Sequence, residues 1–360
     1  MKILYILDQD IHSGKTSGII HKIKAKVDEW NKLGFEVELL SLYSFTLYNR
    51  EMNVIDSKNS FKVLKHTKIM TLYRLMKSSY LLYKHINKFN FDLIYFRTPR
   101  LYMPFISSAL KHKKVVMELN SDDVEEWRCN NKFIWIVNNI TRHLFYSKAS
   151  AFVSVSKELD YRYKNFSKRT IVIGNGISTD EFSMIKDTEN KRPQICFVGS
   201  PGYKWHGIEK IEWLAKNCID YDFHLIGEFG EDLSNMKYYG YLTKEEVNQV
   251  ISKCDIAIST LSLYAKNMNE ASPLKSRQYM ALGLPFIYAY YDTDLDGSEE
   301  FTLRIDNNPS NIEDSLEDIR DFVTKSFRNI NLRTQARVFA ENHIDVKVKE
   351  KVRLKFLSEI

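Results

Sequence analysis

A short loop near the amino terminus has the composition of a phosphate-binding loop. The stretch HSGKTSG (12–18) comes shortly after the apolar run ILYIL, and its Gly-Lys-Thr matches the second half of the pattern Gly-x-x-x-x-Gly-Lys-Ser/Thr. The first glycine of that pattern would fall at position 9, which is Gln9. Without that glycine the backbone cannot turn its N–H groups around the phosphates, which argues against an NTPase. A glycine-containing turn between a strand and a helix is still a general anion site.

A second stretch, NEASPLKSRQYMALGLPFI (269–287), predicts a helix whose amino end binds a diphosphate. Pro273 can occupy the first turn of this helix, and Gly283 ends it. The helix follows the strand-like run IAIST, so its unpaired N–H groups and its dipole attract an anion beyond the end of that strand. Glu270 lies just before the helix and Gln278 lies on it, eight residues later. A surface helix with a glycine cap is the structural alternative.

The acidic stretch DTDLDG (292–297) resembles the start of a calcium-binding loop. Counted from Asp292, position 12 of such a loop requires a bidentate glutamate, but it is Leu303 here. We therefore expect a solvated loop. The histidines lack zinc-ligand spacing and the four cysteines form no Cys-x-x-Cys pair, so we expect no metal and buried, reduced thiols.

The bulk composition is that of a globular protein without a membrane-spanning segment. The 360 residues predict about two domains, and 44% hydrophobic with 27% charged residues is ordinary for a soluble fold. The apolar run at the start is too short for a signal peptide. No stretch approaches the roughly 20 apolar residues of a spanning helix. These features predict an intracellular protein.

Positive charge is concentrated in the first half of the chain. The net charge is +6, yet residues 1–170 carry 29 Lys and Arg against 16 Asp and Glu, a net charge of +13, which leaves −7 for the remainder. Within residues 58–88, eight Lys and Arg occur with no acidic residue, interleaved with Leu, Met and Tyr. This asymmetry favours two domains with different electrostatic partners.

Strand-like runs alternate with helical patterns along almost the whole chain. This alternation predicts an α/β fold of two doubly wound domains with parallel sheets. The polar stretch 178–193 is the expected linker between an N-terminal domain, 1–177, and a C-terminal domain, 194–344. A basic helix at about 345–360 is expected to pack back on the N-terminal domain. The expected strands are 2–7, 36–40, 92–96, 115–119, 151–155, 170–174, 194–199, 223–227, 256–260 and 286–290.

Five segments share their order and residue types with one enzyme family. They are HSGKTSG (12–18), VIGNGISTDEF (172–182), CFVGSPGYKWHG (196–207), KYYGYLTKEEVNQVISKCDIAIS (237–259) and the stretch 269–287. Together they resemble the retaining GT-B glycosyltransferases of group 1, or family 4, of the bacterial surface-polysaccharide type. The resemblance implies two Rossmann-like domains facing across a cleft, with a nucleotide-diphospho-sugar bound mainly by the C-terminal domain.

The resemblance also implies roles for individual donor-site residues. Glu270 matches the first glutamate of the family's Glu-x7-Glu motif and contacts the donor sugar. Gln278 replaces the second, whose hydrogen bonds from the ribose an amide oxygen can also accept. Negative charge builds on the departing nucleotide diphosphate, and we predict that Lys204 acts with Glu270 in catalysis by stabilising this charge. The predicted donor-binding residues are Gly14, Ser200, His206, Tyr239, Tyr241, Ala271, Ser272, Pro273, Leu274, Lys275 and Gln278.

Two positions of the donor site depart from the family pattern. The family often has an arginine where Ser200 stands and a lysine where His206 stands, and Lys204 or Lys275 can substitute for these cations. The loop expected to contact the nucleobase is flanked by two tyrosines, which either stack on the base or pack in the protein. We expect no cofactor and no metal, because the nucleotide-diphospho-sugar is a substrate.

The acceptor is expected to occupy the N-terminal domain. Many relatives have a histidine near MELNSDD (117–123), where this chain has only carboxylates and an amide. No general base is assigned, since in same-face attack the leaving phosphate can take the acceptor proton. The predicted acceptor-binding residues are Arg97, Glu118, Asn120 and Asp122, with a structural ion pair as the equal alternative for Arg97.

The implied activity is transfer of a sugar, with retention, to a lipid-linked glycan in capsule or O-antigen synthesis. The basic region 58–88 then predicts contact with an anionic membrane, with a solvated helix face as the alternative, and hence a cytoplasmic protein peripheral to the inner face of the plasma membrane. No nucleic acid is expected, because no nucleic-acid-binding module is recognisable. The alternatives are a nucleotide-sugar 2-epimerase of the same fold and a non-catalytic protein that binds sugar nucleotides.

Overall fold

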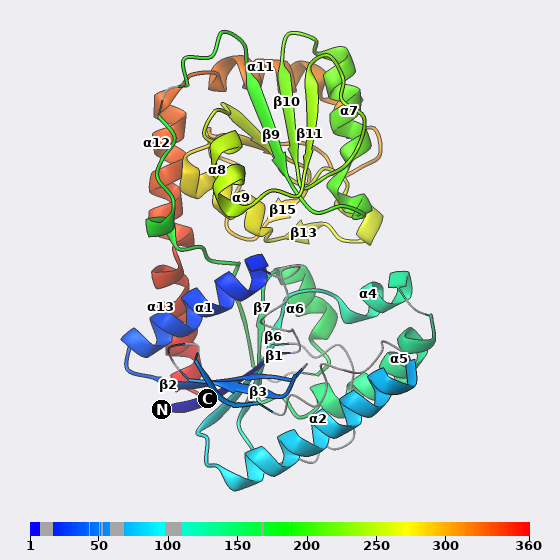
Figure 1. The fold of residues 1–360 in the computed structure, drawn as a ribbon, viewed down its shortest axis with the longest axis vertical. Coiled ribbons are helices and arrows are strands. Elements are labelled where there is room, and N and C mark those ends of the chain that lie inside the picture. Colours follow the sequence, from blue (N-terminus) through cyan, green and yellow to red (C-terminus); the bar gives the residue numbers. More distant parts are fainter. Residues whose placement is uncertain are drawn as a thin grey trace. The chain divides into compact units, whose positions relative to one another are not determined.

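The computed structural model contains two compact units. It describes residues 1–7, 17–42, 44–49, 51, 53–57, 68–97, 110–130, 132–166, 169–186 and 188–360. The N-terminal unit comprises residues 1–173 together with 349–360, and the C-terminal unit comprises residues 174–348 (Figure 1). Within the described residues, no helix is both long and apolar enough to cross a bilayer.

The described part of the N-terminal unit is built on an eight-stranded sheet. The strand order is β4-β3-β2-β1-β5-β6-β7-β8, parallel except for the edge strands β3 and β4. The strands are β1 (Lys2–Leu7), β2 (Glu36–Ser41), β3 (Thr46–Tyr48), β4 (Val54–Ser57), β5 (Leu93–Arg97), β6 (Val115–Leu119), β7 (Ala151–Ser154) and β8 (Thr170–Val172). The helices are α1 (Ser17–Lys32), α2 (Lys68–Lys88), α4 (Asp123–Asn130), α5 (Lys132–Tyr146), α6 (Lys157–Tyr163) and α13 (Val346–Ser358), which begins in the other unit.

Helix α13 completes the hydrophobic core of the N-terminal unit. Ile3, Tyr5 and Leu7 alternate along β1 and therefore face the same side of the sheet. They share one hydrophobic core with Trp30 of α1 and with Leu354 and Leu357 of α13. The Trp30 Nε1–H donates a 2.7 Å hydrogen bond to Glu350 of the same helix. The last twelve residues are therefore an integral part of this unit.

The C-terminal unit has a six-stranded parallel sheet in the order β11-β10-β9-β12-β14-β16, with a separate parallel pair of β13 and β15. Its strands are β9 (Gln194–Val198), β10 (Asp222–Ile226), β11 (Met236–Gly240), β12 (Ile256–Ile258), β13 (Glu270–Ala271), β14 (Phe286–Tyr288), β15 (Tyr291–Asp292) and β16 (Thr302–Arg304). Its helices are α7 (Ile208–Asn217), α8 (Lys244–Ile251), α9 (Leu274–Leu282), α10 (Asn311–Asp314), α11 (Leu316–Ser326) and α12 (Ile330–Phe339). Shorter turns are η2 (Thr179–Glu181), η3 (Lys204–His206), η4 (Leu263–Lys266) and the π-helix η5 (Ala340–Ile344).

Helices cover both faces of the C-terminal sheet. Phe197 of β9 packs in one core with Leu214 of α7 and Phe322 of α11. On the other face, Tyr279 of α9 lies against Phe286 of β14, with ring centroids 6.0 Å apart. A parallel sheet buried on both faces confirms the predicted α/β class.

In each sheet there is a point at which the strand order reverses, so that the strands on its two sides are added in opposite directions across the sheet. In the N-terminal unit the order reverses between β1 and β5, and in the C-terminal unit it reverses between β9 and β12. Ligands of doubly wound sheets bind beyond the carboxyl ends of the strands at such points. A ligand site is therefore expected among the residues that follow β9 and β12, and among those that follow β1 and β5.

Candidate functional site

Most residues predicted for the donor site lie beyond the carboxyl end of the C-terminal sheet. The turn after β9 holds Ser200 and Lys204, both exposed. Glu270 lies on β13 and is half-buried, shortly before the amino end of α9. Gly14 and the rest of its loop before α1 lie outside the described residues.

His206, at the end of η3, is a buried neutral imidazole. Its Nδ1 lies 3.0 Å from Glu228 Oε1, and its ring centroid lies 5.2 Å from that of Phe197. Burial, and next the positive charge of Lys275, lower the pKa of His206 to about 4, against the opposing effect of Glu228. His206 therefore supplies no positive charge near neutral pH, although the family often has lysine at this position.

Two glycines allow the ends of β9 and β10 to approach closely. Gly227 has a φ of +80°, and a Cβ atom there would lie 2.1 Å from the carbonyl oxygen of Gly199. A larger residue at position 227 would be strained and would collide with that backbone. The close approach places the next residue, Glu228, against His206.

Lys275 carries a buried amino group in the first turn of α9. Its Nζ lies 3.9 Å from the centroid of the Phe197 ring and has no hydrogen-bond partner among the described residues. Burial lowers the pKa of Lys275 to about 7, with Glu228 opposing the effect. The residue as a whole is half-buried.

Helix α9 is anchored to the sheet by buried hydroxyl groups. The Tyr279 hydroxyl accepts from the Val198 N–H at 2.9 Å and donates to the Ile258 carbonyl at 3.1 Å. The hydroxyls of Ser276 and Ser259 lie 2.8 Å apart. The amino end of α9 is thereby held beside β9 and β12. At that end Pro273 is the N-cap and makes no side-chain capping bond, and Ala271, Leu274 and Gln278 are half-buried.

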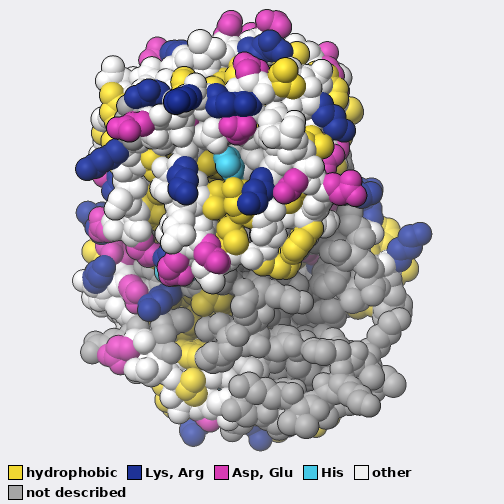
Figure 2. Space-filling view, turned by 45° about the horizontal axis from the view of Figure 1, so that its top comes forward, with side chains coloured by type: hydrophobic (Ala, Val, Ile, Leu, Met, Phe, Trp, Pro, Cys, Tyr) yellow, Lys and Arg dark blue, Asp and Glu magenta, His cyan; other side chains and the backbone are white. Residues whose placement is uncertain are grey.

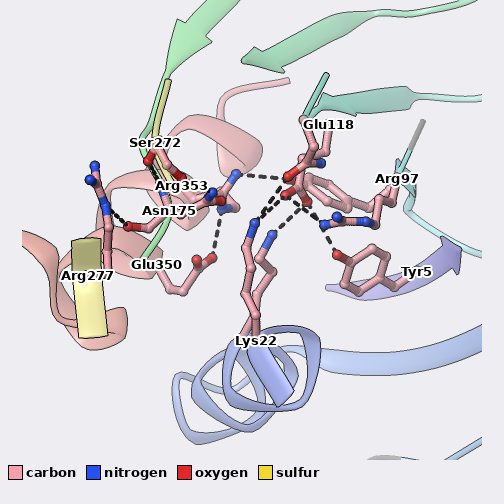
Figure 3. A network of polar contacts seen from close by, with 12 residues as sticks. Tyr5, Lys22, Arg97, Glu118, Asn175, Ser272, Arg277, Glu350 and Arg353 are labelled. Carbon is pink, nitrogen blue, oxygen red and sulfur yellow. Dashed lines mark hydrogen bonds and ion pairs between the residues drawn. The ribbon is translucent and has the colours of Figure 1, made fainter. Parts of the chain in front are cut away.

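The segment before α9 is held in place by a buried ion-pair cluster. Arg277 donates to both Asp292 and Asp294, and its Nε–H donates to the carbonyl of Asn175 at 3.2 Å. The Asn175 N–H donates in turn to the Ser272 hydroxyl at 2.7 Å (Figure 3). These contacts fix the backbone between Glu270 and α9 from two sides.

The prediction of a solvated loop at 292–297 is wrong for its first half. The Asp292 side chain is buried and pairs with Arg277, and Asp294 is half-buried beside it. Within this loop only Asp296 and Gly297 are exposed. The acidic pattern of this stretch is explained by a buried guanidinium rather than by a cation from solution.

The two tyrosines predicted at the nucleobase loop differ in exposure. Tyr241 is 72% exposed and makes an edge-on contact with Phe229, 62% exposed, at 5.3 Å between ring centroids. The Tyr239 hydroxyl lies 2.9 Å from His224 Nδ1 and is engaged within the protein. An exposed aromatic pair can stack on a planar base, so Tyr241 and Phe229 fit that role better than Tyr239.

On the face seen in the upper part of Figure 2, Lys and Arg, Asp and Glu, and apolar side chains are interspersed.

The acceptor-site candidate Glu118 lies in a buried charge network at the end of β6. The Lys26 Nζ donates to Glu118 at 2.6 Å, and the Lys22 Nζ and Tyr5 hydroxyl lie at 3.5 and 3.3 Å (Figure 3). Arg97 Nη1 lies 3.7 Å away. Burial alone would raise the pKa of Glu118, but the surrounding cations, Lys26 first, hold it well below its usual range.

Glu118 and Asp122 both make structural contacts within the protein, and their predicted contact with the acceptor stays a prediction. Glu118 is completely buried and engaged with the protein's own cations. Asp122 caps α4 by accepting from the Val124 N–H at 2.9 Å and pairs with Arg162. Arg97 makes the structural ion pair that was its alternative role.

Asn120 also takes part in the network around Glu118. Its Oδ1 accepts a 3.1 Å hydrogen bond from Lys22. Its Nδ2, like the Nη1 of Arg97, is buried and makes no hydrogen bond within the described residues. Contact between the acceptor and Asn120 or Arg97 stays a prediction.

Sequence reasoning missed several residues that lie in the candidate site. Glu228 and Phe229 lie in GEFG (227–230), where glycines on both sides of a charged and an aromatic residue after a strand are a usable signal. Arg277 and Asp292 had no such signal, because neither motif nor spacing indicates their pairing. No cluster of three metal-ligating side chains occurs in the part of the chain that the structure describes.

Comparisons with known proteins point to one fold. Residues 24–181 match the sequence profile of Glycosyltransferase Family 4. Sucrose-phosphate synthase from Thermosynechococcus elongatus is similar with a TM-score of 0.71 and 12% identity, over 99% of this chain and 98% of that one. Anabaena Alr3699/HepE in complex with UDP-glucose has a TM-score of 0.63 and 15% identity, and the lipopolysaccharide outer core galactosyltransferase WaaB has 0.65 and 13%, each over 100% of both chains. None of the curated protein sequences matches this chain.

Proposed function

We propose that this chain, which has the GT-B fold and matches glycosyltransferase family 4 over residues 24–181, transfers a sugar with retention from a nucleotide-diphospho-sugar to a glycan. The observation that carries the proposal is the set of groups beyond the switch point of the C-terminal sheet. Helix α9 is bonded to the last residues of β9 and β12, the buried amine of Lys275 contacts the Phe197 ring of β9, and Glu270 lies shortly before the helix. The Anabaena relative is in complex with UDP-glucose, which is a donor of the proposed class.

The proposed chemistry needs little from the protein beyond positioning and charge. The bond between the sugar and the diphosphate breaks, and the N–H groups of α9 with a nearby cation stabilise the negative charge on the leaving group. Glu270 accepts hydrogen bonds from sugar hydroxyls, and the departing phosphate takes the acceptor's proton on the same face. Lys204 remains a predicted contact to the diphosphate, and Gln278 to the ribose.

Replacing Glu270 by glutamine is expected to weaken donor binding about 10- to 100-fold. The substitution removes the charge from the predicted acceptor of the sugar hydroxyls, and hydrogen bonds to charged groups contribute about 1.5–3 kcal/mol. Thermal-shift screening with nucleotide-sugars identifies a donor, because about 2.7 kcal/mol of stabilisation appears at a hundredfold excess over Kd. Calorimetric titration of that donor then measures the effect of the substitution.

The matched control is Glu317→Gln, since Glu317 is an exposed glutamate on α11 of the same unit. Equal donor affinity in both variants and the unaltered protein would show that Glu270 has been assigned wrongly. Donor hydrolysis or epimerisation without an acceptor separates the remaining possibilities. Epimerised donor indicates the 2-epimerase, and binding without any turnover indicates the non-catalytic protein.

The proposed acceptor is lipid-linked, and α2 is the proposed contact with an anionic membrane. Its exposed face presents large side chains at helical spacing, with Tyr73 52%, Met76 46%, Tyr80 41% and Tyr83 36% exposed. The Lys84 Nζ lies 4.8 Å from the centroid of the Tyr80 ring. Aromatic rings beside lysines are typical of segments that lie at a membrane interface. The preceding basic residues, 58–67, lie outside the described part of the chain.

Reversing three charges on α2 is expected to abolish binding to anionic vesicles. The variant K77E/K84E/K88E loses about 1 kcal/mol of attraction per lysine and adds repulsion, which predicts at least a hundredfold weaker association. Sedimentation with phosphatidylserine-containing vesicles measures the bound fraction, and binding of the unaltered protein should fall as salt rises. Reversing Lys216, Lys253 and Lys325 on the C-terminal unit is the control. Binding that ignores both salt and the α2 charges contradicts membrane docking.

A further inference from the structure

Helix α5 of the N-terminal unit carries a row of large apolar side chains that are open to solvent. Ile136 is 50% exposed, Ile140 71% and Leu144 53%. They stand four residues apart, so they lie on one side of the helix along about 12 Å, at about 1.5 Å per residue. Single apolar residues on a surface need no explanation, but three in one row indicate an interaction surface. We call this row the α5 stripe.

The other side of α5 packs against the sheet, so the α5 stripe faces outward. Phe145 is buried, and its ring meets that of Phe96 on β5 edge-on, with the centroids 5.2 Å apart. Tyr146 is buried beside it, with the centroids of these two rings 5.5 Å apart. The hydrophobic core thus uses one side of the helix, and packing within the unit does not account for the α5 stripe.

Helices α2 and α5 cover the same face of the N-terminal sheet (Figure 1). The His85 side chain of α2 lies 2.7 Å from Glu38 on β2, while α5 contacts Phe96 on β5. Glu38 is in register with Leu4 of β1, which is in register with Ile94, two residues before Phe96. Because alternate residues of a strand point to the same side, Glu38 and Phe96 lie on one face. The exposed apolar side chains of α2 and the α5 stripe therefore face outward on the same side of this unit.

Both helices lie in segments of the sequence that contain no acidic residue. No Asp or Glu occurs in residues 57–91, which include α2, or in residues 127–157, which include α5. The second segment carries five basic residues, Arg128, Lys132, Arg142, Lys148 and Lys157. Among the described side chains of α5, the exposed ones beside the α5 stripe are Lys132, Asn139 and His143. An apolar row flanked by neutral and basic groups suits a partner that is both apolar and negatively charged.

We propose that α5 inserts the α5 stripe into the interfacial region of an anionic lipid bilayer. The inference rests on the proposed membrane contact of α2 and extends it, because α2 supplies attraction between charges and α5 supplies burial of apolar area. A bilayer offers negative head groups, with acyl chains within reach of a side chain that enters by roughly 5–10 Å. A second copy of this chain fits less well, since pairing through α5 would bring like charges together.

Two contacts have consequences that one contact lacks. A single helix on a membrane leaves the unit free to rotate about that helix, whereas two helices on one face fix which side of the unit meets the lipid. The two contributions also respond differently to salt. Attraction between lysines and head groups falls as ionic strength rises, but burial of apolar area does not. Binding should therefore fall with salt to a residual level that depends on the α5 stripe.

Replacing the α5 stripe by serine tests the proposal. The variant I136S/I140S/L144S is expected to bind vesicles of phosphatidylcholine and phosphatidylserine roughly a hundredfold more weakly, because three apolar side chains lose their burial. Sedimentation of the full chain over a range of lipid concentrations measures the affinity. The melting temperature without lipid should not fall, since the replaced side chains are exposed and serine has about the helix propensity of isoleucine.

The matched control replaces exposed apolar side chains of the other unit by serine. These are Ile219, Ile330 and Val338. Their replacement is expected to leave vesicle binding unchanged, because the C-terminal unit has no part in the proposed contact. Vesicles of phosphatidylcholine alone are the lipid control, and the unaltered protein should bind them more weakly than the anionic ones, since the attraction between charges is lost.

A fluorescent probe on the helix tests insertion itself. The environment-sensitive dye NBD is attached to I140C in a C129S background, since the other three cysteines are buried. Its emission should shift to shorter wavelength when anionic vesicles are added, because the dye leaves water. NBD attached to I219C should show no shift, although Ile219 is 75% exposed, as open to solvent as Ile140.

Three results would overturn the inference. Full vesicle binding by I136S/I140S/L144S, with loss in K77E/K84E/K88E, would remove α5 and leave the contact of α2 in place. A dimer of the unaltered protein without lipid, abolished by I136S/I140S/L144S while vesicle binding is kept, would make the α5 stripe a contact between copies. Failure of the unaltered protein to bind anionic vesicles would remove both membrane contacts. Nucleotide-sugar binding, measured separately, would in that case leave the proposed sugar transfer standing.

Discussion

Replacing Glu118 by alanine is expected to lower the free energy of unfolding by about 3–5 kcal/mol. The carboxylate is completely buried and is the partner of Lys26, Lys22 and Arg97. Removing one member of a buried charge cluster leaves the others desolvated without compensation. The ammonium of Lys26 depends most on this carboxylate. Burial, and next Arg353, already lower the pKa of Lys26 to about 8, and Glu118 opposes that effect. Urea unfolding followed by circular dichroism measures the difference.

The control is an ion pair on the surface of the same unit. Glu36 lies 3.3 Å from Lys2 with its side chain 73% exposed, so Glu36→Ala should cost less than about 1 kcal/mol. The pH dependence of the free energy of unfolding is a second test. The pKa of Glu118 is lowered in the folded state, so its contribution is present above its unfolded pKa and is lost as pH falls through the folded one. Equal costs for the two variants, or a Glu118 effect that vanishes near neutral pH, would refute a buried network.

Replacing Arg277 by leucine is expected to destabilise the C-terminal unit by a similar amount, about 3–5 kcal/mol. The substitution leaves Asp292 buried without its cation. It also removes the hydrogen bond to the carbonyl of Asn175, whose N–H group positions Ser272. Donor binding should weaken as well, because the backbone between Glu270 and α9 loses its support. Thermal unfolding and nucleotide titration of the same protein measure the two effects.

A double substitution distinguishes charge from shape at this place. Arg277→Leu with Asp292→Leu removes both charges, and apolar replacements of a buried pair are often neutral, so much of the lost stability should return. Lys325→Ala is the control, since Lys325 and Glu300 form an exposed pair at 3.6 Å. A double variant no more stable than Arg277→Leu alone would mean that packing, and not the buried charge, limits the stability of this region.

The sheets were predictable from the sequence because most central strands are uninterrupted apolar runs. Strand β1 occupies the predicted residues 2–7, and the other predicted strands agree within three residues at each end. Strands β3, β4, β11, β13, β15 and β16 were missed. Of the two that form the edges of the C-terminal sheet, β11 (MKYYG) contains a lysine and a glycine, and β16 (TLR) is three residues long. Such short, polar edge strands have no period-2 pattern, and they form because a neighbouring strand offers hydrogen bonds.

In the candidate site, local features were predictable and pairings were not. Helix α9 ends at Gly283 as predicted. The C-cap has a φ of 73°, a conformation that glycine adopts without strain, so the glycine in the sequence marks the end of the helix. The contacts of His206 with Glu228 and of Arg277 with Asp292 join residues 22 and 15 positions apart, and only the folded chain brings them together. The burial of the Lys275 amine is likewise a property of packing.

The membership of residues 349–360 in the N-terminal unit has a consequence for biosynthesis. The ribosome makes residues 174–348, an entire unit, before it makes the helix that completes the first core. Until then Trp30 lacks its hydrogen bond to Glu350, and the surface that Leu354 and Leu357 cover is open to water. The N-terminal unit is thus translated before the C-terminal unit but completed after it, and a fragment of residues 1–173 should aggregate where a fragment of 174–348 stays dissolved.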